Sequence, residues 1–457
     1  MSAVETMTNV VESPSTNADP FSYVREWDRL RGVMGWWHSF ELPDGTKIEG
    51  VSSLDIQKQR IEAFPIPAAL NGKRVLDIGT WDEWFAFELE RRGADVVAVD
   101  CWDNPRFREM HALLNSRVDY RRLDMYQLTP ECVGRFDIVL FMGVLYHLKH
   151  PLLALERVCA LTTDFAAVES FILREEHRPG MGVAERPVME FYETDELGGQ
   201  TDNWYGPSLP CLSALCRTAG FARVEVQKVF EFSASVACHR HWQPVEAEAE
   251  VGPELLAAHH NMNYGINFDS GIDEYVTCSF RASLPQIERD DVQPEVGGFG
   301  IRPIKVEPAG GDVWRTHFKL PPGLVAGWHD VRLRVNNSQP SNEKCIAVDL
   351  RPKLGPITIA GVADGQTWKR NELNLNTGDV VVIWIDGLPE NSDVNNVKVF
   401  LDSKLLRTVY VGSAGLGNST QVNVRVPQLF PAGAAEICVE AMGIRSTPVR
   451  VEVLGRL

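Results

Sequence analysis

Strand-like and helix-like patterns alternate along the first half of this chain. Short apolar runs predict strands at residues 74–78, 95–99, 119–123, 136–141 and 165–170, and apolar residues at helical spacing predict helices at 82–92, 105–116 and 151–161. Such alternation is typical of a parallel β-sheet covered by helices on both faces. A proline near its start and Gly220 at its end delimit a further predicted helix at 207–220, and strands near 222–229 and 233–239 complete the sheet.

The pattern changes beyond about residue 245, where helical periodicity fades. Short β-rich runs separated by Gly, Pro and Asn turns predict strands at 331–335, 380–385, 397–401 and 422–426. Regular short strands of this kind are typical of β-sandwiches. We therefore expect a β-sandwich module at 250–350, a linker near 350–356, and an immunoglobulin-like β-sandwich at 355–457.

The N-terminal segment differs from both halves. Residues 1–20 lack an apolar core and a basic start, so we expect a disordered tail. Aromatic and apolar residues at helical spacing from Phe21 to Trp37 predict a helical cap, which opens a first domain at 21–245. No run reaches the roughly 18 apolar residues of a membrane span, and we expect a soluble, cytoplasmic protein with no membrane partner.

The composition of the chain limits the kinds of partner that it is expected to bind. Among 457 residues the formal net charge is −17, which repels phosphate backbones and makes nucleic acid an unlikely partner. The nine cysteines form no C-x-x-C pair and fit reduced thiols better than a disulfide framework. His147 and His150 are three residues apart, but no carboxylate pattern accompanies them, so no metal site is predicted.

The candidate chemistry is concentrated in one βαβ pattern. An apolar strand ends at Asp77 and Gly79, and a second ends at Asp100, which follows Asp77 by 23 positions. The glycine turn lets the backbone approach a ligand closely, and an acid at the second strand tip can hold two ribose hydroxyls. The turn reads D-x-G-x-W-x-E, which is neither G-x-G-x-x-G nor a Walker loop, and this favours a cofactor without a pyrophosphate.

Five motifs in order now point to a family: Val75-Leu-Asp-Ile-Gly79, Val99-Asp100, Leu123-Asp124-Met125, Phe136-Asp-Ile-Val-Leu140 and Gly143-Val-Leu-Tyr-His147. Together they resemble class I S-adenosylmethionine-dependent methyltransferases. The sequences D-I-G-T-W-D at 77–82, M-G-V-L-Y-H at 142–147 and N-W-Y-G-P-S-L-P-C-L at 203–212 are similar to a branch that includes the bacterial tRNA wobble-uridine carboxymethyltransferases and small-molecule relatives. The resemblance covers about residues 60–240. It implies an α/β fold with a Rossmann-like, seven-stranded sheet whose final strand runs antiparallel.

The resemblance also implies a set of cofactor contacts. Asp77 and Gly79 would border the methionine portion of S-adenosyl-L-methionine, and Asp100 would accept hydrogen bonds from both ribose hydroxyls. Asp124 and Met125 would lie beside the adenine. For Asp100 and Asp124 the alternative is a plain structural cap at the strand end. The full predicted cofactor set is Asp77, Gly79, Trp81, Asp100, Asp124, Met125 and Gly143.

His147 is the candidate catalytic residue, because it is expected at the carboxyl end of a strand, where ligands of open α/β sheets bind. Its ordinary pKa would let it take a proton from a substrate hydroxyl, although a structural or substrate-positioning role is the alternative. Tyr146, Trp204 and Tyr205 are predicted to line the substrate mouth, with core packing as their alternative. Glu169, at the end of the fifth strand, is left open between substrate contact and a helix cap.

Glu83 is where the chain departs from the branch, which has glycine at this position. A glutamate there brings bulk and negative charge toward the methionine carboxylate, where like charges repel. Alternatively it points outward from the first turn of the helix, where an acid is favoured.

These observations favour an S-adenosylmethionine-dependent methyltransferase that acts on an oxygen of a polar small molecule or glycan. Two alternatives remain open: tRNA wobble-uridine modification, which the acidity disfavours, and a catalytically impaired methyltransferase fold that serves as an interaction protein. The β modules would be suited to homo-oligomer formation.

Overall fold

The computed structural model describes residues 35–82, 84–246, 248–262, 264–350, 355–413, 419–427 and 429–455. The predicted tail at 1–20, residues 21–34 of the predicted helical cap, Glu83 and most of the predicted linker lie outside this range. The chain divides into two compact units between Trp242 and Gln243, and each unit is described by itself.

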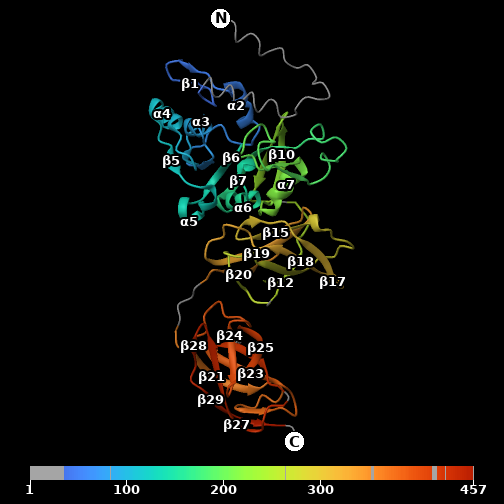
Figure 1. The fold of residues 1–457 in the computed structure, drawn as a ribbon. Helices are drawn as coiled ribbons and strands as arrows, with labels where there is room; N and C mark the ends of the chain where they lie inside the picture. The colour runs from blue at the N-terminus through green and yellow to red at the C-terminus, as the bar shows by residue number, and fades with distance from the viewer. Residues whose placement is uncertain are drawn as a thin grey trace. The chain divides into compact units, whose positions relative to one another are not determined.

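A seven-stranded sheet forms the centre of the N-terminal unit, in the order β10-β11-β7-β6-β3-β4-β5 (Figure 1). The five strands from β3 to β7 are parallel, whereas β11 runs antiparallel to both of its neighbours, as the resemblance implied. Parallel strands align their carboxyl ends along one edge of a sheet, which brings the loops that follow them together. The strands are β3 (Arg74–Ile78), β4 (Asp95–Asp100), β5 (Asp119–Arg122), β6 (Phe136–Met142), β7 (Thr162–Phe171), β10 (Arg223–Val229) and β11 (Ser233–His239).

Helices cover both faces of this sheet, with a separate hydrophobic cluster under each set. One cluster includes Leu155 of α6 and Leu212 of α7, and the other includes Ile61 of α2, Phe85 of α3 and Phe107 of α4. Side-chain caps and early prolines explain where α4 and α7 begin, since Asn104 and Ser208 accept from backbone N–H groups of the first turn. The helices are α2 (Leu54–Glu62), α3 (Trp84–Arg91), α4 (Pro105–Leu113), α5 (Pro130–Val133), α6 (Pro151–Leu161) and α7 (Leu209–Thr218).

The structure overlaps every strand and helix range predicted for residues 74–239, but it differs near the N-terminus. Gly35 to Trp37, the described end of the predicted helical cap, are not helical. They lead into a short hairpin of β1 (Phe40–Glu41) and β2 (Lys47–Ile48), followed by α2, which the pattern did not predict. Only Gln57 and Ile61 of α2 are buried, so the helix carries too narrow an apolar stripe to be recognised from periodicity.

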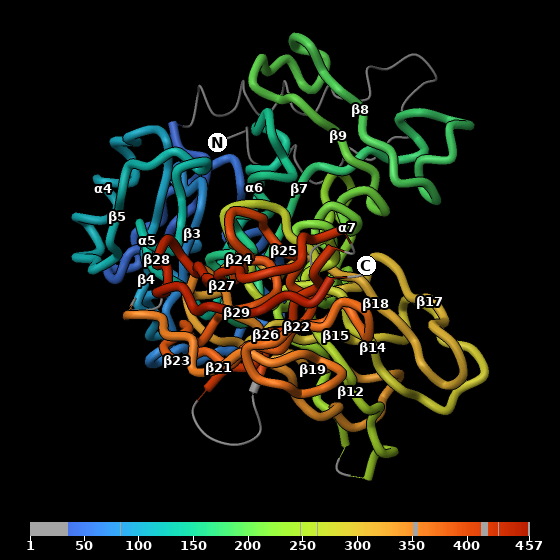
Figure 2. The backbone as a smooth tube through the Cα atoms, turned by 90° about the horizontal axis from the view of Figure 1, so that it is seen from below, coloured from blue at the N-terminus to red at the C-terminus, as the bar shows by residue number. Residues whose placement is uncertain are grey.

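A second hairpin lies between β7 and α7. Strands β8 (Met189–Phe191) and β9 (Tyr205–Pro207) pair antiparallel and lie side by side in Figure 2. Three short 3₁₀ turns complete the described helical elements: η1 (Met125–Gln127), η2 (Leu145–His147) and, in the second unit, η3 (Arg289–Asp291). None of the described helices is long and apolar enough to cross a bilayer.

The C-terminal unit contains β-strands almost exclusively. Its first part has a four-stranded sheet, β12-β14-β18-β17, and a five-stranded sheet, β13-β20-β19-β15-β16, and buried side chains of both sheets form one cluster. These strands are β12 (Glu254–His260), β13 (Asn267–Phe268), β14 (Tyr275–Arg281), β15 (Val292–Val296), β16 (Phe299–Gly300), β17 (Lys305–Gly310), β18 (Val313–Lys319), β19 (Gly327–Val335) and β20 (Lys344–Val348).

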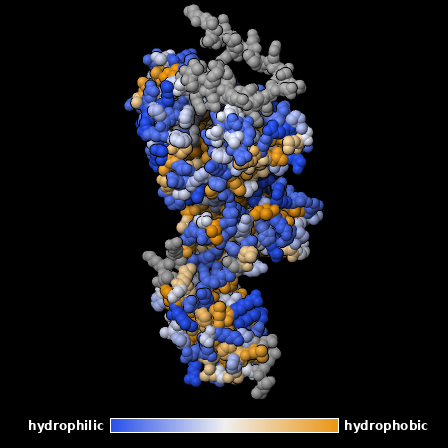
Figure 3. Space-filling model, in the orientation of Figure 1, coloured by the Kyte–Doolittle hydropathy of each residue, from blue (hydrophilic) through white to orange (hydrophobic). Residues whose placement is uncertain are grey.

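The second part of this unit has its own hydrophobic cluster, which draws on residues 357–453. Its strands follow the order β21-β23-β26-β25-β24-β27-β29-β22, with β28 paired to β27. They are β21 (Thr358–Asp364), β22 (Glu372–Asn374), β23 (Val380–Asp386), β24 (Val397–Leu401), β25 (Lys404–Ser413), β26 (Thr420–Arg425), β27 (Gly433–Ala441), β28 (Ile444–Arg445) and β29 (Val449–Leu454). On the face seen in Figure 3, apolar patches are interspersed among polar residues.

Candidate functional site

The turn after β3 is shaped by a glycine that no other residue could replace without a clash. Gly79 has φ +79, and a Cβ at this position would lie 2.3 Å from Cγ2 of Val144. Its N–H donates to the Val99 carbonyl at 2.8 Å, which ties the turn to the end of β4. The turn continues through Trp81, a non-glycine residue at φ +46 that is 40% exposed. The backbone is therefore held in a strained path next to the carboxyl edge of the sheet.

Asp100, at the end of β4, holds this path in place. Its Oδ2 accepts from the Trp81 N–H at 2.8 Å, and its Oδ1 accepts from the Trp102 N–H at 2.8 Å. The carboxylate is buried, yet each oxygen keeps a second lone pair with which it can accept from a ligand hydroxyl. The sequence favoured a ligand contact for Asp100 over a plain strand-end cap, and the structure shows that its carboxylate also holds the neighbouring backbone.

A cleft of about 270 Å³ opens at this edge of the sheet. The predicted residues that line it are Gly79, Asp100, Asp124, Met125, His147 and Trp204. Asp124 is held at the mouth of η1, where its Oδ1 accepts from the Tyr126 N–H at 2.8 Å, and Met125 is buried beside it. Residues predicted for the cofactor and residues predicted for the acceptor thus share one cleft.

Asp77 lies behind the cleft on β3 and is buried. Its Oδ2 has no hydrogen-bond partner in the part of the chain that the structure describes. Burial, and secondarily the nearby charge of Asp100, raise the pKa of Asp77 to about 7. A buried carboxylate without a partner is costly, and a cationic ligand group would favour its charged form. The site thus fits the ammonium group of a bound amino-acid moiety.

His147 reaches the cleft from η2. Its Nδ1 lies 3.5 Å from Oδ2 of Asp202, within range of an ion pair once the ring is protonated. The imidazole lies against the Tyr146 ring, with centroids 4.4 Å apart. His147 therefore combines access to the cleft with a carboxylate that can stabilise its protonated form.

Tyr146 and Tyr205, which were predicted to line the substrate mouth with Trp204, do not line the cleft. Burial raises the pKa of Tyr146 to about 12, so its hydroxyl keeps its proton and can donate but cannot act as a base. The Tyr146 carbonyl accepts from the Trp204 N–H at 2.7 Å, which ties η2 to the segment before β9. Lys149 Nζ lies 4.6 Å from the Trp204 ring centroid, and Tyr205 donates its hydroxyl to the Lys149 carbonyl at 3.2 Å. Tyr205 thus supports the loop that carries Lys149.

Gly143 lies near a buried ion pair that the sequence did not reveal. A Cβ on Gly143, which has φ +77, would lie 3.7 Å from Tyr146 Oη and 3.9 Å from Arg60 Nη2. Arg60 of α2 donates to Glu169 Oε2 at 2.9 Å, and Ser233 donates to the other Glu169 oxygen. Glu169 of β7 thus forms an ion pair with Arg60 of α2, and it caps none of the described helices. The partners are 109 residues apart along the chain, so local pattern carried no signal for the pair.

A second unpredicted contact anchors the segment before β1. Asp82, buried at the end of the D-I-G-T-W-D sequence, accepts from the Trp37 N–H at 2.6 Å and lies 2.8 Å from His38 Nδ1. Burial lowers the pKa of His38, which keeps the ring neutral at neutral pH. The aromatic run at Trp36 to His38 therefore fastens the N-terminal segment to the glycine turn.

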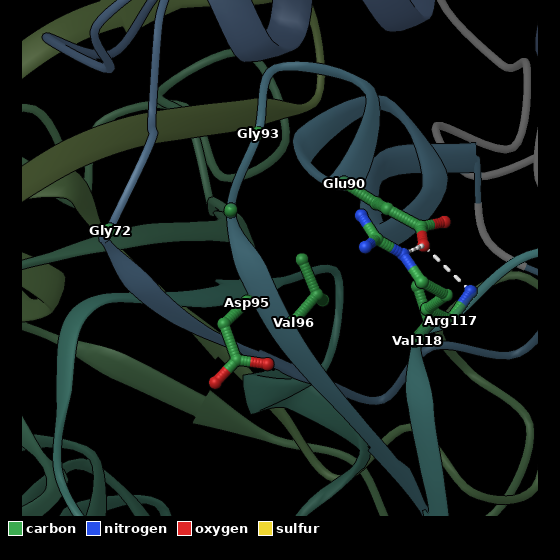
Figure 4. A pocket seen from close by; sticks show the side chains of 8 residues that line it. Gly72, Glu90, Gly93, Asp95, Val96, Arg117 and Val118 are labelled. Carbon is green, nitrogen blue, oxygen red and sulfur yellow. Dashed lines mark hydrogen bonds and ion pairs between the residues drawn. The ribbon is translucent and has the colours of Figure 1, made fainter.

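A larger cavity, of about 310 Å³, lies at the amino ends of the strands, where β4 begins at Asp95 (Figure 4). Glu90 there accepts from the Arg117 N–H and from Ser116 Oγ, both at 2.6 Å. None of the predicted site residues lines this cavity. Because ligands of open α/β sheets bind at the carboxyl ends of the strands, the smaller cleft is the candidate functional site. Within the described residues, no group of three or more His, Cys, Asp or Glu side chains is arranged to hold a metal ion.

Comparison with known proteins supports a methyltransferase domain. Residues 54–176 match the family model of a methyltransferase domain. The chain is 35% identical over 141 residues to a ubiquinone biosynthesis O-methyltransferase of Hahella chejuensis, which covers 30% of this chain and 55% of that protein. It is 33% identical over 99 residues to the enzyme of the same name from Pseudomonas aeruginosa strain UCBPP-PA14, covering 21% and 43%. The chain thus spans about half the length of the curated relatives that it matches.

Two solved structures also match part of the chain. The N-terminal domain of EvdMO1, solved in the presence of S-adenosylhomocysteine and D-fucose, is 20% identical, with a TM-score of 0.35 and coverage of 47% of this chain and 95% of that one. The 1,6-didemethyltoxoflavin-N1-methyltransferase of Burkholderia thailandensis, solved with bound 1,6-didemethyltoxoflavin and S-adenosylhomocysteine, is 18% identical, with a TM-score of 0.31 and coverage of 50% and 92%.

Proposed function

We propose that this protein is an S-adenosylmethionine-dependent methyltransferase that methylates an oxygen of a polar small molecule or glycan. The observation that carries the proposal is the single cleft shared by Gly79, Asp100 and Met125 on one side and His147 and Trp204 on the other. The match of residues 54–176 to a methyltransferase domain supports S-adenosylmethionine as the methyl donor, and the O-methyltransferase names of the curated relatives support oxygen as the acceptor atom.

The residues present fit this cofactor. Asp77 would face its ammonium group, and the space that the missing side chain of Gly79 leaves would admit its methionine portion. Asp100 would accept from the ribose hydroxyls with its remaining lone pairs, while Asp124 and Met125 would border the adenine. Trp81 and Gly143 would contribute backbone to the same cradle. When bound, S-adenosylmethionine supplies an electrophilic methyl group on a positively charged sulfur.

His147 is the proposed general base. A neutral imidazole in the cleft accepts the proton of an acceptor hydroxyl, and Asp202 then stabilises the imidazolium across the 3.5 Å separation. Tyr146 keeps its proton and positions the acceptor as a donor, since its pKa is raised to about 12. Trp204 offers an apolar face to the acceptor. The loop that carries Lys149, which the Tyr205 hydroxyl supports, borders the cleft. Alignment and proton removal are the main demands of a single displacement on a hydroxyl.

The proposal extends to the domain organisation. It assigns the chemistry to residues 21–245 and treats 250–350 and 355–457 as two β-sandwich modules, the second immunoglobulin-like, that promote homo-oligomer formation in the cytoplasm. The separate hydrophobic clusters of the two β modules support this division. All nine cysteines are free thiols, which fits a reducing compartment.

Isothermal titration calorimetry with S-adenosylmethionine tests the proposal on the wild-type chain and on Glu83→Gly. Micromolar binding by the wild type is expected. Binding by the glycine variant alone would favour the interaction-protein alternative, in which the site is silenced. Binding by neither chain would remove the cofactor and the proposed function with it.

A further inference from the structure

Two tryptophans form a pair on the second β module, far along the chain from the residues of the cleft. Trp384 lies on β23 and Trp368 on the loop after β21, with ring centroids 6.3 Å apart and planes tilted by 34°. Trp368 is 60% exposed. Trp384 lies over Gly361 of the neighbouring strand, where an added Cβ would be 3.3 Å from the indole Cε3. The glycine thus lets the indole ring lie against the sheet surface.

The same face of the sheet continues with polar and aromatic side chains. Trp384 is directly opposite Gln421 on β26, and Asn423, two residues further along β26, is opposite Tyr410 on β25. Residues paired directly across neighbouring strands share a face, so these side chains adjoin one another. Gln421 donates its amide to Asn423 Oδ1 at 3.0 Å. Tyr410 is 42% exposed, and its hydroxyl lies where a side chain on Gly412 would be.

The loop that presents Trp368 is held rigidly. The backbone of Trp368 has φ +58, which is unfavourable for a bulky residue. The buried carboxylate of Asp364 accepts from the N–H groups of Gln366 and Thr367 at 2.9 and 2.7 Å, and from that of Asn374 at 2.9 Å. A strained conformation that buried hydrogen bonds maintain is common where a side chain is presented to a ligand.

We propose that this aromatic face, formed by Trp368, Trp384, Tyr410, Gln421 and Asn423, binds a neutral glycan chain. Sugar rings offer apolar C–H faces that pack on indole and phenol rings, and hydroxyl edges that pair with amides, which both donate and accept. The five side chains carry no formal charge, while the whole chain carries −17, so an anionic polymer would be repelled and a neutral one would not. This site is independent of the proposed methyl transfer.

Native affinity electrophoresis of the full chain tests this site. The gels contain one neutral polysaccharide each: hydroxyethyl cellulose, galactomannan, xylan or dextran. At least one of these gels is expected to retard the wild type. The Trp384→Ala and Trp368→Ala variants are expected to lose affinity for the retarding polysaccharide by about tenfold.

The matched control is Trp328→Ala, which removes a tryptophan that is 40% exposed on β19 of the other β module. It should be retarded like the wild type. Because Trp368 is mostly exposed, its removal uncovers no core and keeps the test valid even if Trp384→Ala misfolds. Migration unaffected by all four polysaccharides, or equal retardation of wild type and Trp368→Ala, overturns the proposal. The proposal is also overturned if the wild type binds no glycan but self-associates, and Trp368→Ala abolishes that self-association.

Discussion

In the N-terminal unit most of the cleft-lining residues lie at or just after the ends of neighbouring parallel strands, whereas in the C-terminal unit the aromatic face spans neighbouring antiparallel strands and the loop after β21. Parallel strands bring their carboxyl ends to one edge, so Gly79, Asp100 and Asp124 converge although they stand at or just after the ends of three different strands. Antiparallel neighbours send consecutive loops to opposite edges, but their outward side chains form a continuous surface.

The two regions also differ in the charge of their side chains. Asp100 and Asp124 line the cleft, while Asp77 is buried on β3 and its pKa is raised. The aromatic face contains only neutral side chains. The two proposals differ accordingly: a small ligand with a positive charge in the N-terminal unit and an extended neutral ligand in the C-terminal unit. Four experiments sharpen or break this comparison.

The largest effect is expected for Asp100→Ala. The substitution removes two proposed charge-assisted hydrogen bonds to the cofactor, at about 1.5–3 kcal/mol each, so affinity for S-adenosylmethionine should fall by about 10²–10⁴-fold. Calorimetry measures this, and circular dichroism checks that the unit stays folded despite loss of the Trp81 and Trp102 contacts. Asp103→Asn, which alters an exposed acid next to the same loop, is the control. Equal affinity of Asp100→Ala and wild type would contradict the assignment.

His147→Ala should lower turnover on a hydroxyl acceptor by about 10²-fold or more, because the proposed base is lost. Affinity for the cofactor should change little. The readout beyond rate is the pH profile of turnover, whose acidic limb should disappear with the imidazole. A fall of less than tenfold with an unchanged profile would return His147 to a structural role.

The Asp77→Asn substitution should raise the stability of the folded protein at pH 8 and weaken its binding of S-adenosylmethionine. The pKa of Asp77 in the folded protein, about 7, exceeds its ordinary value of 3.8, so the folded chain keeps a proton that the unfolded chain has lost. Its stabilising contribution is complete below about pH 4 and disappears as the pH rises through 7. The asparagine variant should therefore be more stable at pH 8, by at most about 4 kcal/mol, while binding S-adenosylmethionine more weakly.

Chemical denaturation at pH 5 and pH 8 measures this stability difference, which should grow with pH. A variant that is less stable than the wild type at pH 8 would show that the Asp77 carboxylate is not strained in the folded protein.

The smallest expected effect is that of truncation after Pro244. The cofactor residues all precede residue 150, so a chain ending at Pro244 should bind S-adenosylmethionine as the full chain does, with a changed oligomeric state or solubility. Calorimetry and sedimentation measure the two properties. Loss of binding in a truncation that stays folded would mean that the β modules complete the site, and the division of roles between the two regions would fail.

Local patterns of apolar and turn-forming residues predicted most of the fold. The period of apolar residues located the strands and helices from 74 to 239, and turn residues marked strands such as 380–386 and 397–401 in the C-terminal unit. Of the residues predicted from the motifs, six line the cleft, namely Gly79, Asp100, Asp124, Met125, His147 and Trp204, whereas Asp77, Trp81, Gly143, Tyr146 and Tyr205 do not. Periodicity failed at α2, which buries only two side chains, and at Gly35 to Trp37, whose aromatic spacing resembles a helix.

By itself the sequence determined most of the strands and helices of residues 74–239, and which strand ends carry acids and glycines, because both depend on near neighbours along the chain. The tertiary structure alone decided the pairing of Arg60 with Glu169, the anchoring of Trp37 on Asp82, and the second role of Asp100 in holding the glycine turn. It also decided which outward side chains of β23, β25 and β26 meet on one face, since strand register sets that arrangement. These contacts join positions tens of residues apart, and their energies depend on distance and burial in space, which no local pattern records.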